Sequence, residues 1–253
     1  MKNNSLRKSK TQLLCNVWDV ASAKAAQECG FDIIGTSSGA IASMLGYQDG
    51  EEITFSELKY IVERISKSVD LPLSIDIEGG YSRTPEIIAD HIIQLQAFNI
   101  IGINIEDSIV ENGQRIMLDP KQFAEILQQL NSILNLKQVN TFINVRTDSF
   151  LLKERNALEQ SIDRAKLYAK AGASGVFVPC IQLREDISTL IKQISIPLNV
   201  MCMPNLPNFK LLENLGVNRI SMGNFLFEKN QEALKKYLKQ IQSDQSFKSI
   251  FEL

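Results

Sequence analysis

Residues 73–106 read LSIDIEGGYSRTPEIIADHIIQLQAFNIIGINIE. The stretch begins with an apolar run at 73–77 and ends with a second run at 102–105, while residues 85–98 place Ile88, Ile92 and Leu95 at helical spacing. Largely apolar runs are typical of parallel strands that are buried on both faces, and a parallel pair needs a crossover connection such as a helix. The stretch therefore predicts a strand–helix–strand unit.

The same alternation continues along the whole chain. Further helices are predicted at 55–68 and 157–171 and from Asp119-Pro120 onward, and Thr84 is the expected N-cap of the helix that has Pro85 as its first residue. The predicted strands are residues 13–18, 32–36, 73–77, 102–105, 141–145, 175–178, 198–201 and 219–221. Eight such strands predict one α/β domain over residues 1–253, a (β/α)₈ TIM barrel. A doubly wound open sheet is the alternative, but no G-x-G-x-x-G follows the first strand.

The C-terminal segment extends the predicted barrel. Residues 230–251 form a long helical pattern that ends with Phe247, Ile250 and Phe251. This segment is longer than the closing helix of a barrel needs to be. We therefore expect an extended C-terminal helix that packs on another subunit, in a homo-oligomer.

The composition excludes several classes of partner. The chain has 27 basic and 29 acidic residues, a formal net charge of −2, so nucleic acid and anionic membranes are not expected partners. Cys15, Cys29, Cys180 and Cys202 form no C-x-x-C pair. Residues 1–5 lead into no apolar run of a signal peptide, and no stretch is long enough to span a membrane. These features are typical of a reduced, cytoplasmic protein.

The chain contains a single histidine, His91, inside the predicted helix 85–98. One histidine argues against Ser-His-Asp catalysis, histidine zinc sites and facial-triad iron sites. We interpret His91 as a surface or interface residue rather than a catalytic one.

Acidic residues gather where the third and fourth predicted strands end, the position of active sites in TIM barrels. Asp76 and Glu78 are two residues apart, so both should face the same side of their strand, and Glu106 ends the neighbouring strand. Buried carboxylates require a cation or a proton. Oxygen ligands without histidine or thiolate predict Mg²⁺, with Mn²⁺ as the alternative. A capping or arginine-pairing role remains the structural alternative for each acid alone.

Arg146, at the end of the fifth predicted strand, adds a cation to the same mouth. Its planar guanidinium suits a substrate carboxylate. The sequence places Asn104, Asp107 and Asp148 beside these residues, and we interpret them as supporting or structural groups.

Six motifs in order resemble the isocitrate lyase/phosphoenolpyruvate mutase superfamily over nearly the whole chain. They are TSSG (36–39), LGYQDG (45–50), DIEGGY (76–81), GINIED (102–107), NVRTDSF (144–150) and AGASGVFVP (171–179). The resemblance implies a Mg²⁺-dependent enzyme for small 2-oxo or 2-hydroxy acids, with an enolate-like intermediate. It also implies tetramers in which the last helix is exchanged between subunits, although a dimer remains open.

The resemblance also implies roles for individual residues. Asp76 would be the direct metal ligand, while Glu78, Glu106 and Asp49 would hold metal-bound waters. The implied substrate-binding groups are Arg146 for the carboxylate and the backbone at Ser38 and Gly39 for the enolate oxygen. Metal and amide dipoles together would stabilise the charge that bond cleavage creates.

The loop after the fourth strand departs from the family pattern. Lyases of the superfamily carry a Lys-(Lys/Arg)-Cys-Gly-His signature there, and phosphonate-processing members carry Lys-x-Asn, but residues 108–119 contain no cysteine, histidine or lysine. This shorter segment favours a decarboxylase-like or hydrolytic reaction, with Glu111, Asn112 or Arg115 as candidate loop groups. Cys180 and Cys202 lie elsewhere, and we interpret them as structural thiols.

The leading hypothesis is therefore a Mg²⁺-dependent carbon–carbon bond lyase or decarboxylase acting on a small carboxylic acid. One alternative is a P–C bond hydrolase or mutase for a phosphonopyruvate-like substrate. The other is a barrel that binds metal and carboxylate without catalysis.

Overall fold

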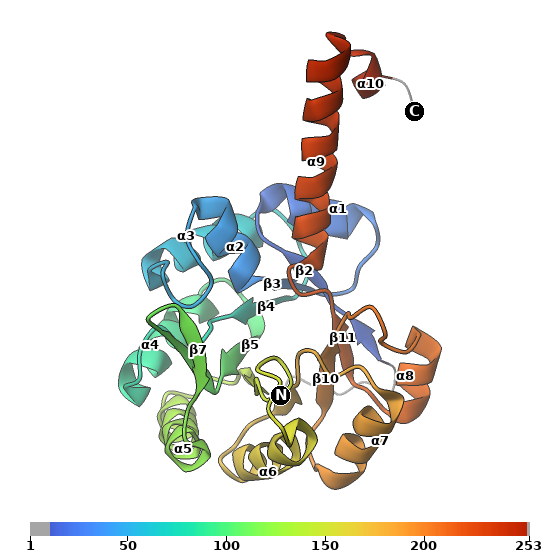
Figure 1. The fold of residues 1–253 in the computed structure, drawn as a ribbon. Coiled ribbons are helices and arrows are strands. Elements are labelled where there is room, and N and C mark those ends of the chain that lie inside the picture. Colours follow the sequence, from blue (N-terminus) through green and yellow to red (C-terminus); the bar gives the residue numbers. More distant parts are fainter. Residues whose placement is uncertain (1–10, 252–253) are drawn as a thin grey trace.

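A parallel β-sheet forms the wall of a barrel in the computed structural model, which describes residues 11–251 (Figure 1). Its strands are β1 (Gln12–Leu13), β2 (Cys15–Val17), β3 (Ile34–Thr36), β4 (Leu73–Asp76), β5 (Ile100–Glu106), β8 (Phe142–Arg146), β9 (Gly175–Phe177), β10 (Leu198–Met201) and β11 (Arg219–Ser221). Each of the eight predicted strands is present within the described range, and their neighbours in the sheet follow chain order.

The first strand closes the barrel because it is divided between two neighbours. β1 pairs in parallel with β11, and β2 pairs in parallel with β3. Between them, the backbone N–H of Leu14 donates to Ile220, whereas that of Cys15 donates to Ile33. One continuous segment thus joins the last strand to the second, which confirms the (β/α)₈ barrel rather than an open sheet.

Helices surround the strands (Figure 1). Within residues 11–251 they are α1 (Val20–Glu28), α2 (Ser38–Leu45), α3 (Phe55–Ser66), α4 (Pro85–Gln96), α5 (Pro120–Leu136), α6 (Ala157–Lys170), α7 (Arg184–Gln193), α8 (Phe209–Leu215), α9 (Phe225–Asp244) and α10 (Lys248–Phe251). A capping box of Thr54 and Glu57 begins α3. Thr84 is the N-cap of α4 as expected, but its side chain makes no capping hydrogen bond.

A helix and a hairpin that bear on the site were not predicted. Helix α2 begins directly after β3, with Ser37 as N-cap. Residues 108–117 form an antiparallel hairpin of β6 (Ser108–Glu111) and β7 (Gln114–Met117). Its turn residues Asn112 and Gly113 both have positive φ, at 51° and 75°. Asn-Gly favours that backbone conformation, so the sequence did contain a signal for this hairpin.

The interior of the barrel is unusually polar at its centre. Ser74, Asn104 and Asn144 each stand two residues before a charged residue of the mouth, so they face inward one level deeper. Asn199 and Arg219 continue this polar lining on β10 and β11. In most TIM barrels, branched apolar side chains fill these layers. Here the apolar core lies largely between the strands and the outer helices.

The C-terminal helices differ in detail from the predicted segment 230–251. Helix α9 begins at Phe225 and extends away from the barrel, and α10 follows after a left-handed residue at Gln245 (Figure 1). Within residues 11–251, no helix combines the length and apolar character needed to cross a bilayer. The prediction about a signal peptide concerned residues 1–5, which lie outside the described residues.

Candidate active site

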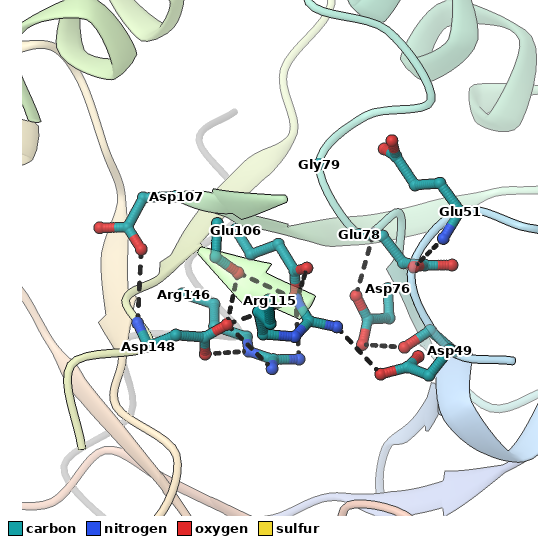
Figure 2. Close-up of polar contacts among 12 residues, drawn as sticks. Asp49, Glu51, Asp76, Glu78, Gly79, Glu106, Asp107, Arg115, Arg146 and Asp148 are labelled. Atoms are coloured by element: carbon teal, nitrogen blue, oxygen red, sulfur yellow. Dashed lines mark hydrogen bonds and ion pairs between the residues drawn. The ribbon is translucent and has the colours of Figure 1, made fainter. Parts of the chain in front are cut away.

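A cavity of about 420 Å³ opens at the C-terminal ends of the strands. Ser38, Gly39, Asp49, Asp76 and Arg146 line it. Five of the residues selected from the sequence therefore surround one space. The close-up in Figure 2 shows the charged groups at its mouth.

Asp76 is the last residue of β4, and its carboxylate is buried. The Ser38 Oγ donates to its Oδ2 (3.2 Å), and the backbone N–H of Glu78 donates to its Oδ1 (3.2 Å). Burial raises the pKa of Asp76, and Arg146 opposes that increase. An acid held in this position by two donors can bind a cation that enters the cavity.

Glu78 lies beyond the end of β4 rather than on it. Its φ is 50°, in the left-handed region, so strand alternation does not describe the direction of its side chain. The backbone N–H of Glu51 donates to its Oε2 (2.5 Å), and the Tyr81 hydroxyl donates to its Oε1 (3.1 Å). Burial raises the pKa of Glu78 to about 8, and neighbouring carboxylates act in the same direction. Glu51 was missed in the sequence, since a main-chain contact leaves no residue-type signal.

Arg146 is fixed by two acids before any substrate arrives. Its Nε and Nη2 donate to the two oxygens of Asp148 (2.6 and 3.1 Å), and its Nη1 lies 3.0 Å from Glu106 Oε2. Burial would lower the pKa of Arg146, but Asp148 and Glu106 hold it well above its usual value. The guanidinium is therefore a permanent cation with a defined orientation.

The β6–β7 hairpin places Arg115 in the mouth (Figure 2). Its Nη1 donates to Glu106 and to Ser108 Oγ (2.9 Å), while its Nη2 donates to Asp49 Oδ2 (3.1 Å). Only 13% of its side chain is exposed. Among the three candidate loop groups, Arg115 is thus the one these contacts bring to the acids. Burial lowers the pKa of Arg115, whereas the neighbouring Glu106 carboxylate raises it, and the pKa lies above its usual value.

Glu106 lies between the two arginines at the end of β5. Burial raises its pKa to about 7, while Arg146 and Arg115 oppose the increase. Asp49 lies on the outer side of Arg115, and 42% of its side chain is exposed. These two acids are joined by one guanidinium rather than by direct contact.

Ser38 and Gly39 form the first turn of α2. The first amides of a helix have no acceptor within the helix, and they carry its partial positive charge. Because Gly39 also lines the cavity, this turn can stabilise an anion there.

The carboxylates fit a hard cation through their chemistry. In the described part of the chain, five acids around the mouth, Asp49, Asp76, Glu78, Glu106 and Asp148, face the two guanidinium groups of Arg115 and Arg146. Within residues 11–251, however, no three His, Cys, Asp or Glu side chains converge as a ligand cluster. A Mg²⁺ site does not require one, because this ion commonly keeps several waters and takes one or two carboxylates. The donor set therefore fits one direct ligand with water-mediated contacts.

The remaining candidates have structural partners. Asp107 accepts from Arg164 Nη1 (2.9 Å) and the Tyr168 hydroxyl (2.7 Å), in a buried cluster. Asn104 accepts from Asn144 (2.8 Å). His91 stacks on Phe55 and donates from Nδ1 to a backbone carbonyl, so it stands apart from the acids of the mouth.

Cys180 and Cys202 are free and half-buried. Burial raises the pKa of each thiol, which disfavours the reactive thiolate. Both observations agree with structural roles.

Comparisons with known proteins identify the relatives of this chain. The family model described as phosphoenolpyruvate phosphomutase matches residues 3–242. An uncharacterized protein of Mycobacterium tuberculosis (strain H37Rv) is 37% identical over 213 residues, covering 83% of this chain and 77% of that protein. The oxaloacetate decarboxylase of Pseudomonas entomophila (strain L48) is 28% identical over 219 residues, covering 82% and 72%.

A solved structure supports the same relationship. The crystal structure from Burkholderia cenocepacia J2315, provisionally assigned as a phosphonomutase, superposes with a TM-score of 0.86 at 32% identity, covering 93% of this chain and 97% of that one. Members of this group act as lyases, decarboxylases or mutases on small carboxylates. The chain belongs to the phosphoenolpyruvate mutase/isocitrate lyase superfamily.

Proposed function

We propose that this protein is a Mg²⁺-dependent lyase or decarboxylase that cleaves a carbon–carbon bond in a small 2-oxo or 2-hydroxy acid. The observation that carries the proposal is Asp76, a buried acid at the cavity mouth, in a group of carboxylates that outnumber the guanidinium groups. Similarity to an oxaloacetate decarboxylase supports the class of reaction.

Each proposed role follows from a position in the mouth. Arg146 binds the substrate carboxylate, because its guanidinium is charged and already oriented. The first-turn amides at Ser38 and Gly39 stabilise the negative charge that bond cleavage leaves on the 2-oxo oxygen. Asp76 would hold the metal directly, with Glu78, Glu106 and Asp49 holding its waters, and the bound cation would supply Lewis-acid stabilisation of that charge. Mn²⁺ could take the same oxygen donors.

Decarboxylation suits the chemistry of the hairpin. When the bond breaks, its electrons remain on the enolate and neutral CO₂ leaves, so this step needs no acid or base from the loop. Arg115 is the hairpin residue in the mouth, and an arginine stays protonated. It can bind charge but does not replace the cysteine of the longer loop as a proton donor.

A P–C bond reaction is the second candidate. A phosphonate carries more charge than a carboxylate, and Arg115 with Arg146 offers two guanidinium groups at the same mouth. Similarity to the Burkholderia structure supports this alternative.

The reaction is tested by measuring pyruvate and phosphate release from oxaloacetate, 2-methylisocitrate and phosphonopyruvate, with Mg²⁺ and with EDTA. We expect Mg²⁺-dependent pyruvate release, reduced about a hundredfold or more by Asp76→Asn because the charge-stabilising centre is lost. Asp70→Asn, an exposed aspartate before the same strand, is the matched control and should retain activity. Phosphate release would select the second candidate.

Two results would reject the catalytic proposal. If none of the three substrates releases product, a barrel that only binds carboxylates is favoured. If Asp76→Asn keeps full activity, Asp76 has no role in the reaction. Thermal unfolding with Mg²⁺ and oxalate, an enolate mimic, tests the metal separately, because a ligand of the native state raises the midpoint. No increase would argue against the metal site.

We also propose that α9 and α10 pack on another copy of the chain. This segment exposes large apolar side chains: Leu226, Leu234, Tyr237 and Leu238 on α9, Phe247 between the helices, and Ile250 and Phe251 on α10. Several large exposed apolar side chains on one segment are typical of an interface. Leu238→Asp should lower the mass measured by light scattering, whereas Leu136→Asp, an exposed leucine on α5, should leave it unchanged. A monomeric unmodified protein would contradict the proposal.

A further inference from the structure

Arg219 is a buried cation without a counter-ion among residues 11–251. It is 3% exposed on β11 and lines the same cavity as Asp76 and Arg146. Within residues 11–251 it forms no ion pair, and its buried Nε has no hydrogen-bond partner. Its guanidinium lies over the face of Phe142, with 5.6 Å between Cζ and the ring centroid. A buried charge without a partner is costly.

The position of Arg219 separates it from the proposed catalytic groups. It stands two residues before Ser221, so along the strand it lies roughly 6–7 Å deeper than that residue. Ser221 also lines the cavity. The space therefore continues from the mouth into the barrel interior, and a small solute can reach Arg219 from the mouth.

A second side chain with an unpartnered polar atom, Asn199, lies beside Arg219. Asn199 is its register neighbour on β10, and both side chains line the cavity. Asn199 Nδ2 donates to Asn144 Oδ1, and Asn144 Nδ2 donates to Asn104 Oδ1 (2.8 Å). The chain of amides leaves Asn199 Oδ1 buried without a donor. An acceptor is thus available next to an unpaired cation.

These two groups define the ligand they would bind. Arg219 requires a negatively charged acceptor, and its planar fork suits the oxygens of an oxyanion. Asn199 Oδ1 requires a donor, which a halide or a fully deprotonated oxyanion lacks. We infer that the barrel interior contains a second binding site, in which Arg219 and Asn199 bind a small oxyanion that carries a hydroxyl group, of the size and chemistry of hydrogencarbonate. This inference does not depend on the proposed reaction.

The test compares three anions as sodium salts at equal ionic strength and pH. Hydrogencarbonate has the oxyanion and the hydroxyl, nitrate has planar oxygens of similar size without the hydroxyl, and chloride has neither. We expect hydrogencarbonate to raise the thermal midpoint most, by about 3–5 °C at ten times its Kd, and nitrate to raise it less. Equal shifts for all three salts would reject the site.

Variants separate this site from the mouth. Arg219→Met should abolish the hydrogencarbonate shift, whereas Arg146→Met should retain it. Loss in Arg146→Met alone would place the anion at the mouth and overturn the inference, as would an undiminished shift in Arg219→Met. Arg219→Met should also be at least as stable as the unmodified protein without anion, since it removes an unpaired buried charge.

Asn199→Leu is the second, independent variant. It removes the acceptor for the hydroxyl but leaves Arg219 in place, so hydrogencarbonate should then stabilise no more than nitrate does. If Arg219→Met does not fold, this comparison decides the question. A preference for hydrogencarbonate that survives Asn199→Leu contradicts the inferred contact.

Discussion

Arg146 and Arg219 are both buried arginines that line one cavity, but their surroundings are opposite. Arg146 contacts Asp148 and Glu106, which hold its pKa well above the usual value. Arg219 forms no ion pair within the described range, and burial lowers its pKa to about 10. At the mouth, acids of the chain thus neutralise the charge of Arg146. In the interior, no acid of the described residues neutralises Arg219, and that difference indicates where an external anion binds.

A third buried arginine, Arg164, gives the strongest test of whether an unpaired arginine is costly in this barrel. Arg164 pairs with Asp107 in a buried cluster that also contains Tyr168. Asp107→Leu would leave Arg164, like Arg219, without a counter-ion, although Arg164 would keep its hydrogen bonds to the Tyr168 hydroxyl and the Leu118 carbonyl. We expect a loss of about 3–5 kcal/mol in the free energy of unfolding, measured in urea, because a buried charge loses its partner.

The control for Asp107→Leu is the double variant with Arg164→Met. Removing both charges should recover much of the lost stability, since the desolvation cost disappears with the second charge. A loss below about 1 kcal/mol in the single variant would mean that unpaired arginines are tolerated in this barrel. In that case the unpaired state of Arg219 would no longer indicate a ligand.

Arg115 sharpens the comparison at the mouth, with a smaller expected effect. Arg115→Met removes a cation from between Glu106 and Asp49. The mouth becomes more negative, so Mg²⁺ should bind about tenfold more tightly or better, since a unit charge about 6 Å from a divalent ion contributes about 1.4 kcal/mol even at the dielectric constant of water. Titration of the thermal midpoint with Mg²⁺ measures the change.

Arg115→Lys is the matched variant, because it keeps the charge but loses the two-sided contact. Its Mg²⁺ affinity should stay close to that of the unmodified protein. Weaker Mg²⁺ binding in Arg115→Met would show that the guanidinium positions the acids rather than competing with the metal.

The barrel was predictable because its strands are separate apolar runs with clear helices between them. The strands β10 and β11 agree with the predicted residues at both ends. Asp76 and Arg146 were found for a related reason, since the ends of parallel strands share one edge. The family motifs extended this to Ser38, Gly39 and Asp49, which line the same cavity as Asp76.

The missed features depend on three-dimensional context. The contact of Glu78 with the Glu51 amide arises from a left-handed backbone at Glu78, which strand periodicity does not describe. Arg115 reaches the acids because Asn112-Gly113 turns the chain into a hairpin, a signal that was present but not used. The unpaired state of Arg219 is a property of all its neighbours, and no single motif encodes it.

The divided first strand has a consequence for how the chain folds. Asn16 Oδ1 accepts from the backbone N–H of Met222, which is 206 residues away. Closing the barrel therefore joins residues 206 positions apart, and the chain must lose loop-closure entropy before this contact can form. Until then β3 and β11 are open sheet edges, which are prone to intermolecular pairing. The pairing that closes the barrel is therefore also the one that protects the folding chain from aggregation.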